Sequence, residues 1–160
     1  MDFKSLIREF HPILFKIGKA YTKDDDFDDL YQEMLINLWR SYSSFEGKSK
    51  LSTWVYRVVL NTALTYHRDK NRKSIASVDL KEAGLQEATI EDERKEEEIE
   101  LLYQCIRELK KDDRSVILLF LEDRTYEEIA EIIGITKTNV GVKINRIKKK
   151  LNELMIEKGY

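Results

Sequence analysis

The sequence predicts an all-α protein, made of two small helical domains joined by a flexible acidic linker, with a helix–turn–helix in the second. One proline and six glycines in 160 residues leave few breaks in a chain that is 42% hydrophobic and 36% charged. Such a composition favours helices over a sheet. Apolar residues recur at helical spacing along most of the chain. Between Asp79 and Glu100, ten acids outnumber three bases and the apolar repeat fades, as in an extended segment.

The expected first domain covers residues 1–72 and contains three helices. A first helix is predicted at about Phe3–Lys19. A second begins after Asp24–Asp26, whose charge suits the positive end of a helix dipole. The segment Ser43–Lys50 is predicted to form a loop around Gly47. A third helix is predicted from about Leu51 to Arg72. Residues 73–98 are the expected linker.

The expected second domain covers residues 99–160 and contains the clearest local sequence motif. Thr125 and Glu128 have the spacing of a capping box at a helix start. Gly134 stands where that helix would end in a left-handed residue, and Thr136 can cap the next helix. Six Lys or Arg residues and no acid lie between Thr136 and Leu151.

A short capped helix, a tight turn and a basic second helix form a unit that can enter a DNA major groove. Lys143 and Arg146 are expected on the free face of the second helix, with no nearby acid to compete for them. The candidate contacts to base edges and phosphates are Thr138, Asn139, Lys143, Arg146 and Lys148. The alternative is a helical hairpin with a solvated basic face.

Aromatic, basic and polar residues mingle between Ser43 and Arg72, a mixture that suits unstacked single-stranded bases. Trp54 also fits an ordinary core position, whereas Phe45 on a polar loop is harder to explain by packing. The candidate contacts are Phe45, Lys48, Ser49, Trp54, Arg57, Asn61 and Arg68.

Other function classes are disfavoured. The acidic cluster Asp24–Asp29 lacks the glycine and the glutamate of a calcium loop, so no metal and no cofactor are expected. No nucleophile–base set or phosphate-binding glycine loop is visible, which argues against an enzyme. No apolar run reaches the roughly 18 residues that span a bilayer, and the N-terminus has no signal core. With its single Cys105, the chain is expected to be cytoplasmic, without membrane insertion.

Two segments resemble a known family, the extracytoplasmic-function sigma factors of RNA polymerase. Asp29–Trp39 (DLYQEMLINLW), Phe45–Ser49 (FEGKS) and Leu51–Arg57 (LSTWVYR) are similar to the second region of these factors. Tyr126–Gly134 (YEEIAEIIG) and the helix after it are similar to their fourth region. The order, the spacing and the acidic linker between them agree.

The resemblance implies a transcription initiation factor that binds RNA polymerase core, directs it to promoter DNA and assists promoter opening. The loop Phe45–Ser49 would hold a base flipped from the minus-ten element, and Asn61 would contact the same strand. The helix from Thr136 would read the minus-thirty-five element. The second helix would dock on the polymerase through Asp29, Gln32, Glu33, Ile36, Asn37 and Arg40.

Some residues depart from the family pattern. Gly141 and Val142 stand where Arg and Ser are frequent, and Glu46 and Lys48 reverse the usual charge order of the loop. These changes bear on the promoter sequence rather than on the class. Two rival interpretations stay open: a stand-alone helix–turn–helix regulator and a helical adaptor or anti-sigma-like scaffold. The sequence also leaves open whether an anti-sigma factor binds the protein.

Overall fold

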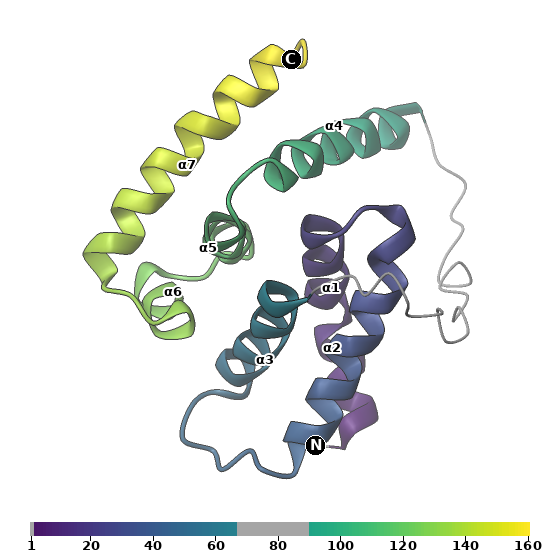
Figure 1. Ribbon diagram of the computed structural model, residues 1–160, viewed down its shortest axis with the longest axis vertical. Helices are drawn as coiled ribbons and strands as arrows, with labels where there is room; N and C mark the ends of the chain where they lie inside the picture. Colours follow the sequence, from purple (N-terminus) through teal and green to yellow (C-terminus); the bar gives the residue numbers. More distant parts are fainter. Residues whose placement is uncertain (1, 67–89) are drawn as a thin grey trace.

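All regular structure is helical in the residues that the computed structural model describes, 2–66 and 90–160 (Figure 1). A 3-10 turn, Asp24–Asp26, precedes the second α-helix. The α-helices in these ranges are α1 (Phe3–Tyr21), α2 (Phe27–Tyr42), α3 (Leu51–Thr65), α4 (Ile90–Arg107), α5 (Lys111–Leu121), α6 (Tyr126–Ile133) and α7 (Lys137–Glu157). The prediction of an all-α protein is confirmed.

Helices α1, α2 and α3 pack against one another as an N-terminal bundle. Leu14, Met34 and Val59 are among the side chains of its core, and each is 0% exposed. Burying a side chain of this size contributes roughly 1.5–3 kcal/mol, so the shared core holds the three helices together. Gly18 allows a close approach of the α2 start, because a Cβ atom there would lie 2.6 Å from the ring of Phe27.

In the C-terminal half, α7 packs along α4, α5 and α6. Ile106, Ile129 and Ile144, from α4, α6 and α7, are completely buried in this half. The long helix α7 therefore gives the shorter helices a common surface, and its opposite side stays exposed.

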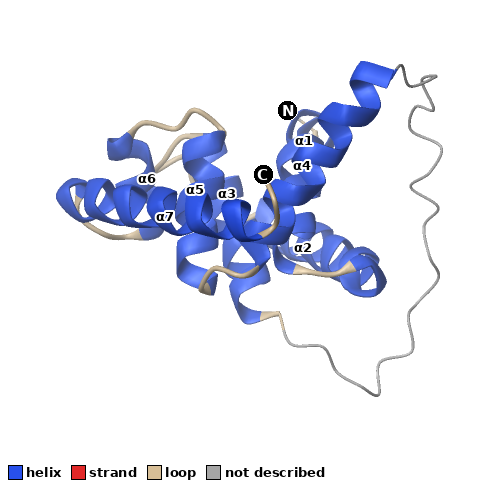
Figure 2. Ribbon diagram, turned by 90° about the horizontal axis from the view of Figure 1, so that it is seen from above, coloured by secondary structure: helices blue, strands red, loops and turns tan. Residues whose placement is uncertain are grey.

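The two halves also pack on each other. Helix α3 contacts α6 and α5, and α1 contacts α4 and α5 (Figure 2). The Tyr21 hydroxyl donates to the Lys111 carbonyl at 2.8 Å, and the Arg107 Nη1 donates to the Lys19 carbonyl at 2.9 Å. Lys16 and Glu122 add an ion pair between the halves. The described chain is thus one closed arrangement in which both halves share a hydrophobic core.

Two predicted boundaries were wrong. The first helix of the second half begins at Ile90 rather than near 99, so residues 90–98 of the expected linker are helical. Glutamate, lysine and arginine are good helix formers, and acids near a helix N-terminus favour it electrostatically without needing a buried face. Helix α3 ends at Thr65, and Tyr66 is extended at φ −66° and ψ 120°. Residues 73–89 of the expected linker and 67–72 of the expected third helix lie outside the described residues.

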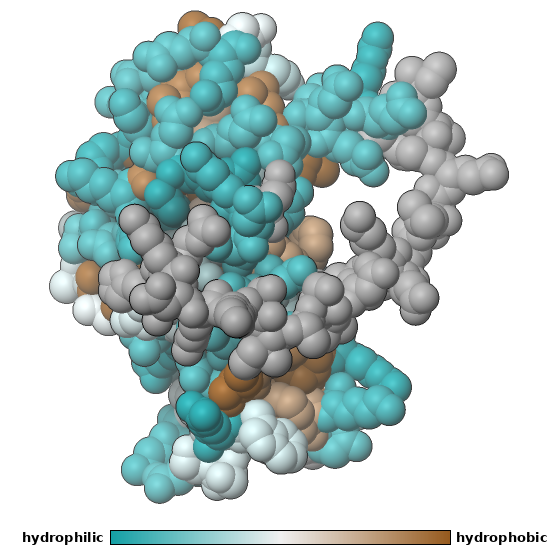
Figure 3. Space-filling model, turned by 45° about the vertical axis from the view of Figure 1, so that its right-hand side comes forward, coloured by the Kyte–Doolittle hydropathy of each residue, from teal (hydrophilic) through white to brown (hydrophobic). Residues whose placement is uncertain are grey.

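Eight large apolar side chains stay exposed among the described residues, and two of them, Ile36 and Trp39, lie three positions apart on α2. They include Ile36 at 46%, Trp39 at 64% and Val142 at 60% exposed. Figure 3 accordingly shows a face that is mainly hydrophilic, with apolar atoms in separate patches. In the two described ranges, no helix has the length and apolar character needed to cross a membrane.

Candidate nucleic-acid interface

The helix–turn–helix is built by local capping, as predicted. The Glu128 amide donates to the Thr125 Oγ1 at 3.1 Å, and the Thr125 amide donates to the Glu128 carboxylate at 3.2 Å. This bond from the Thr125 backbone lowers the pKa of the Glu128 carboxyl. Gly134 has φ 84° and ψ 35°, and its amide donates to the Ala130 carbonyl at 2.8 Å. Thr136 caps α7 by accepting the Asn139 amide at 3.1 Å.

Helix α7 has one buried and one exposed side. Its inward stripe is Val140, Ile144, Ile147, Leu151 and Leu154. Thr138, Asn139, Arg146 and Lys148 are exposed, as the predicted DNA contacts must be. Val142 is also exposed on α7 but was not predicted as a contact. Its position opposite the apolar stripe could have indicated this exposure. An exposed valine in a recognition helix can contact a thymine methyl group.

The expectation that no acid competes for Lys143 and Arg146 was wrong. Asp113, in the first turn of α5, accepts a bond from Arg146 Nη2 at 3.1 Å. The same carboxylate oxygen lies 3.7 Å from the Lys143 Nζ. Lys143 is half-buried, whereas Arg146 keeps 60% of its side chain exposed. The acid comes from another helix, so the charge pattern of α7 alone did not reveal it.

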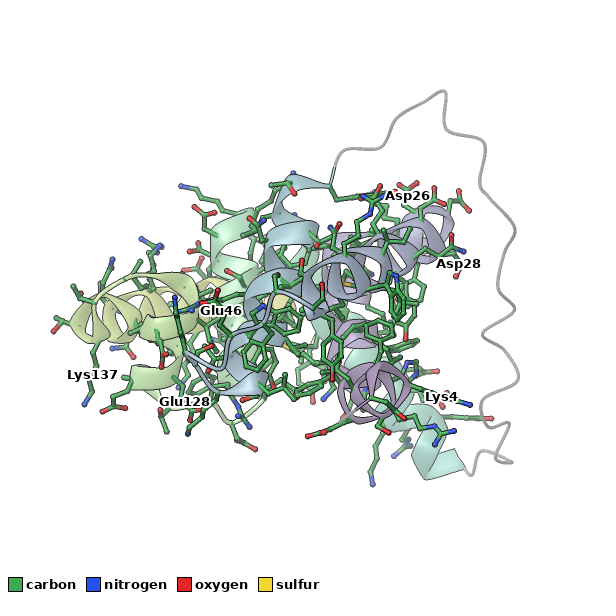
Figure 4. All side chains as sticks on the ribbon, turned by 90° about the horizontal axis from the view of Figure 1, so that it is seen from below. Lys4, Asp26, Asp28, Glu46, Glu128 and Lys137 are labelled. Carbon is green, nitrogen blue, oxygen red and sulfur yellow. The ribbon has the colours of Figure 1, made fainter. Side chains whose placement is uncertain are left out.

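Two other basic residues of the helix–turn–helix, Lys148 and Lys137, also interact with neighbouring side chains. The Lys148 Nζ lies 4.4 Å from the centre of the Phe120 ring, a cation–π contact that orients the side chain. Lys137 pairs with Glu127 at 2.6 Å, but both side chains are more than half exposed, so DNA phosphates can compete for this lysine. Glu128 and Lys137 lie at one end of the molecule in Figure 4, and Asp26 and Asp28 at the other.

The loop between α2 and α3 is less free than its sequence indicates. The rings of Phe45 and Trp54 lie 5.2 Å apart at 43°, and both residues are half-buried, so packing does explain Phe45. Gly47 has φ 73°, which allows the loop to turn. Lys48 is exposed and pairs with Glu46 at 2.8 Å.

The remaining predicted single-strand contacts lie on or near α3. The Ser49 hydroxyl donates to the Lys50 carbonyl at 3.3 Å. Arg57 crosses between the halves and donates from Nη2 to the Glu131 carbonyl of α6 at 2.7 Å. Asn61 is exposed and lines the groove between the halves. Arg68 lies outside the described residues.

That groove has a volume of about 860 Å³ and runs between α2 and α3 on one side and α5–α7 on the other. Polar residues of its lining include Asn37, Asn61, Asp112 and Lys143. Three predicted DNA contacts therefore line this groove: Arg57 and Asn61 from the first half and Lys143 from the second.

The predicted polymerase-docking residues lie along α2 but differ in exposure. Ile36 and Arg40 are exposed, and Asp29, Gln32 and Glu33 are half-buried. The Asn37 Nδ2 donates to the Thr62 Oγ1 at 2.9 Å, so this amide helps to hold α2 against α3.

Trp39 belongs to the same exposed region and was missed in the prediction. It is 64% exposed and makes an edge contact with Phe3, with ring centres 5.0 Å apart. Trp39 is three residues from Ile36, which places the two side chains on one helix face. This spacing could have identified Trp39 as part of the docking surface.

Comparisons with known proteins agree with this architecture. Residues 6–73 match the family model of sigma-70 region 2, and residues 99–151 match that of sigma-70 region 4. The ECF RNA polymerase sigma-E factor of Haemophilus influenzae is 29% identical over 96% of this chain and 89% of its own. The factor of the same name from Escherichia coli is 29% identical over 94% of this chain and 84% of its own.

Two solved structures share the fold. CnrH in complex with the cytosolic domain of CnrY has a TM-score of 0.69 and 18% identity, covering 99% of this chain and 89% of that one. The sigma factor RpoE of Bartonella quintana, in complex with the anti-sigma factor NepR, has a TM-score of 0.64 and 20% identity, with 96% of each chain covered. The chain belongs to the sigma-70 family and is a sigma factor of the extracytoplasmic-function type, built from regions 2 and 4.

Proposed function

We propose that this protein binds RNA polymerase core in the cytoplasm, directs it to promoters with two sequence elements and assists strand opening. The observation that carries the proposal is the presence of region 2 and region 4 in one chain, at residues 6–73 and 99–151. Sigma factors are not enzymes, so the protein's contribution is binding and positioning. The cytoplasmic location is part of the proposal, since the polymerase acts there.

Region 4 would read the duplex of the minus-thirty-five element through α7. Thr138, Asn139, Arg146 and Lys148 are exposed on that helix, and a basic helix of this kind suits the negative potential of the groove. Lys143 would contribute from the edge of the groove between the halves, near Asp113.

Region 2 would hold the unstacked strand of the minus-ten element. The Phe45–Trp54 pair offers ring faces for stacking, and Lys48, Ser49, Arg57 and Asn61 would contribute polar groups. Arg68, which lies outside the described residues, is proposed as a contact from the sequence alone. A pocket for one flipped base offsets an unstacking cost of a few kcal/mol, which is how binding can open a duplex without chemistry.

The polymerase would dock on the α2 face. Its proposed contacts are Asp29, Gln32, Glu33, Ile36, Asn37 and Arg40, to which exposed Trp39 is now added. Asn37 would use its carbonyl oxygen, because its Nδ2 donates to Thr62. An isoleucine that is 46% exposed among charged residues is typical of an interface.

DNA binding requires the closed arrangement to open. In the closed arrangement Arg57 commits one guanidinium nitrogen to the Glu131 carbonyl of the other half. The two elements of promoter DNA lie more than one helical turn, about 34–36 Å, apart, which favours separated halves. We propose that residues 1–72 and 99–160 separate as two domains on the polymerase. A regulator that stabilises the closed arrangement would keep the factor inactive. The complex of the similar sigma factor RpoE with the anti-sigma factor NepR supports an anti-sigma partner for this chain.

Co-elution with core polymerase tests the proposal against a stand-alone helix–turn–helix regulator. The protein is mixed with core and run on a size-exclusion column, with and without an excess of a known sigma factor. Elution with core, lost on competition, is expected of a sigma factor. A protein that binds duplex DNA but never elutes with core would be a stand-alone regulator.

A further inference from the structure

Asp113 is an acid in an unusual position, between α5 and the recognition helix α7. Its side chain is only 12% exposed, yet it lies within ion-pair distance of two of the proposed DNA contacts. Arg146 Nη2 donates to it at 3.1 Å, and the Lys143 Nζ lies 3.7 Å from the same oxygen. One carboxylate thus serves two cations.

The fold holds this carboxylate in place from its own side. Asp113 is the third residue of α5, where the helix dipole stabilises a negative charge. The neighbouring Ser115 is 1% exposed and bonds back to the Asp112 carbonyl at 2.7 Å, which fixes the first turn. A carboxylate positioned in this way keeps its place while Arg146, 60% exposed, can still present its outer surface to DNA.

We propose that Asp113 is a positioning residue that sets promoter specificity, an inference that rests on the proposed reading of duplex DNA by α7. It competes with phosphates for Lys143 and Arg146, so binding to arbitrary DNA is weakened. It also holds the Arg146 guanidinium in one orientation. The remaining N–H donors of Arg146 then point to the place of one base edge, whereas a mobile side chain would donate to any nearby phosphate.

Phosphate binding gives the size of the expected effect. Each cation freed to neutralise a phosphate steepens the dependence of log K on log salt by about 0.9. A contact that contributes nothing at 1 M salt therefore strengthens binding roughly eightfold at 0.1 M. Removing the Asp113 charge should release about one such contact. Binding to the correct sequence should change less, because Arg146 loses its fixed orientation there.

The test uses polymerase holoenzyme formed with the full chain. Two duplex probes are compared: the one that wild-type holoenzyme selects from a randomised library, and a scrambled duplex of the same composition. Affinities are measured across a salt series for Asp113→Asn. Asp112→Asn is the matched control, because it removes the same charge from the adjacent, exposed position. Thermal unfolding of each variant checks that it folds.

Asp113→Asn should bind the scrambled duplex about five- to tenfold more tightly at 0.1 M salt, with a steeper salt dependence. Its preference for the selected duplex should fall by a similar factor, and Asp112→Asn should resemble wild type. Equal tightening on both probes, or an unchanged preference, would overturn the inference. If Asp113→Asn fails to fold, Asp113→Glu takes its place, and it should retain the wild-type salt slope while losing part of the preference. Failure of wild-type holoenzyme to select any sequence would instead overturn the proposed function.

Discussion

Replacing Ile36 on α2 by serine should weaken binding to polymerase core. Ile36 is 46% exposed in the free protein, so docking can bury about half of its side chain. Full burial of an isoleucine contributes roughly 1.5–3 kcal/mol, so the substitution should cost about 0.7–1.5 kcal/mol of binding. That corresponds to roughly a three- to twelvefold rise in Kd, and adding Glu33→Gln should increase the loss.

The assay is competition for labelled core against a reference sigma factor. Ile99→Ser is the matched control, since Ile99 is 49% exposed but lies on α4, away from the proposed face. Both substitutions are at exposed positions and should change the free energy of unfolding by less than about 0.5 kcal/mol. A folded Ile36→Ser, Glu33→Gln double variant with wild-type affinity would refute the docking assignment.

Three further outcomes follow from single contacts. Gly18→Ala should destabilise the N-terminal bundle by about 1–3 kcal/mol, because its Cβ would meet the Phe27 ring at 2.6 Å; an unchanged denaturation midpoint would contradict this. If the Arg146 side chain reaches a guanine, Arg146→Ala should cost about 1–3 kcal/mol of promoter binding and relax the sequence preference. If it contacts only a phosphate, the substitution should instead reduce the salt slope by about one. If neither change is seen, Arg146 does not belong to the site. The hydrogen bond from the Thr125 backbone lowers the pKa of the Glu128 carboxyl in the folded state from its ordinary value of 4.5. The ionised Glu128 therefore stabilises the fold fully above the unfolded pKa, and this stabilisation is lost as the pH falls through the folded pKa. Glu128→Gln should therefore flatten the acid side of the stability profile, and an identical profile would contradict the capping argument.

Local chemistry made much of the C-terminal half predictable. The capping box at Thr125, the left-handed Gly134 and the cap at Thr136 each depend on residues within a few positions, and all three occur in the structure. The apolar stripe of α7 was also predictable, because helical spacing alone places its members on one side.

Contacts between distant segments were not predictable in this way. Asp113 reaches Arg146 across 33 positions, and Asn37 reaches Thr62 across 25. Both pairs arise from packing of separate helices, which periodicity does not specify. The start of α4 at Ile90 was missed for another reason: its charged first turns lack the apolar repeat by which helices are recognised.

Transcription from a library of randomised promoters tests the central claim most directly. Core polymerase is supplied with this protein alone, and the 5′ ends of the transcripts are sequenced. We predict starts at a fixed distance downstream of a shared two-element sequence, absent with core alone and reduced by the Ile36→Ser, Glu33→Gln double variant. Random or absent starts, from a protein that is folded and bound to core, would contradict the conclusion that it is a promoter-specific initiation factor.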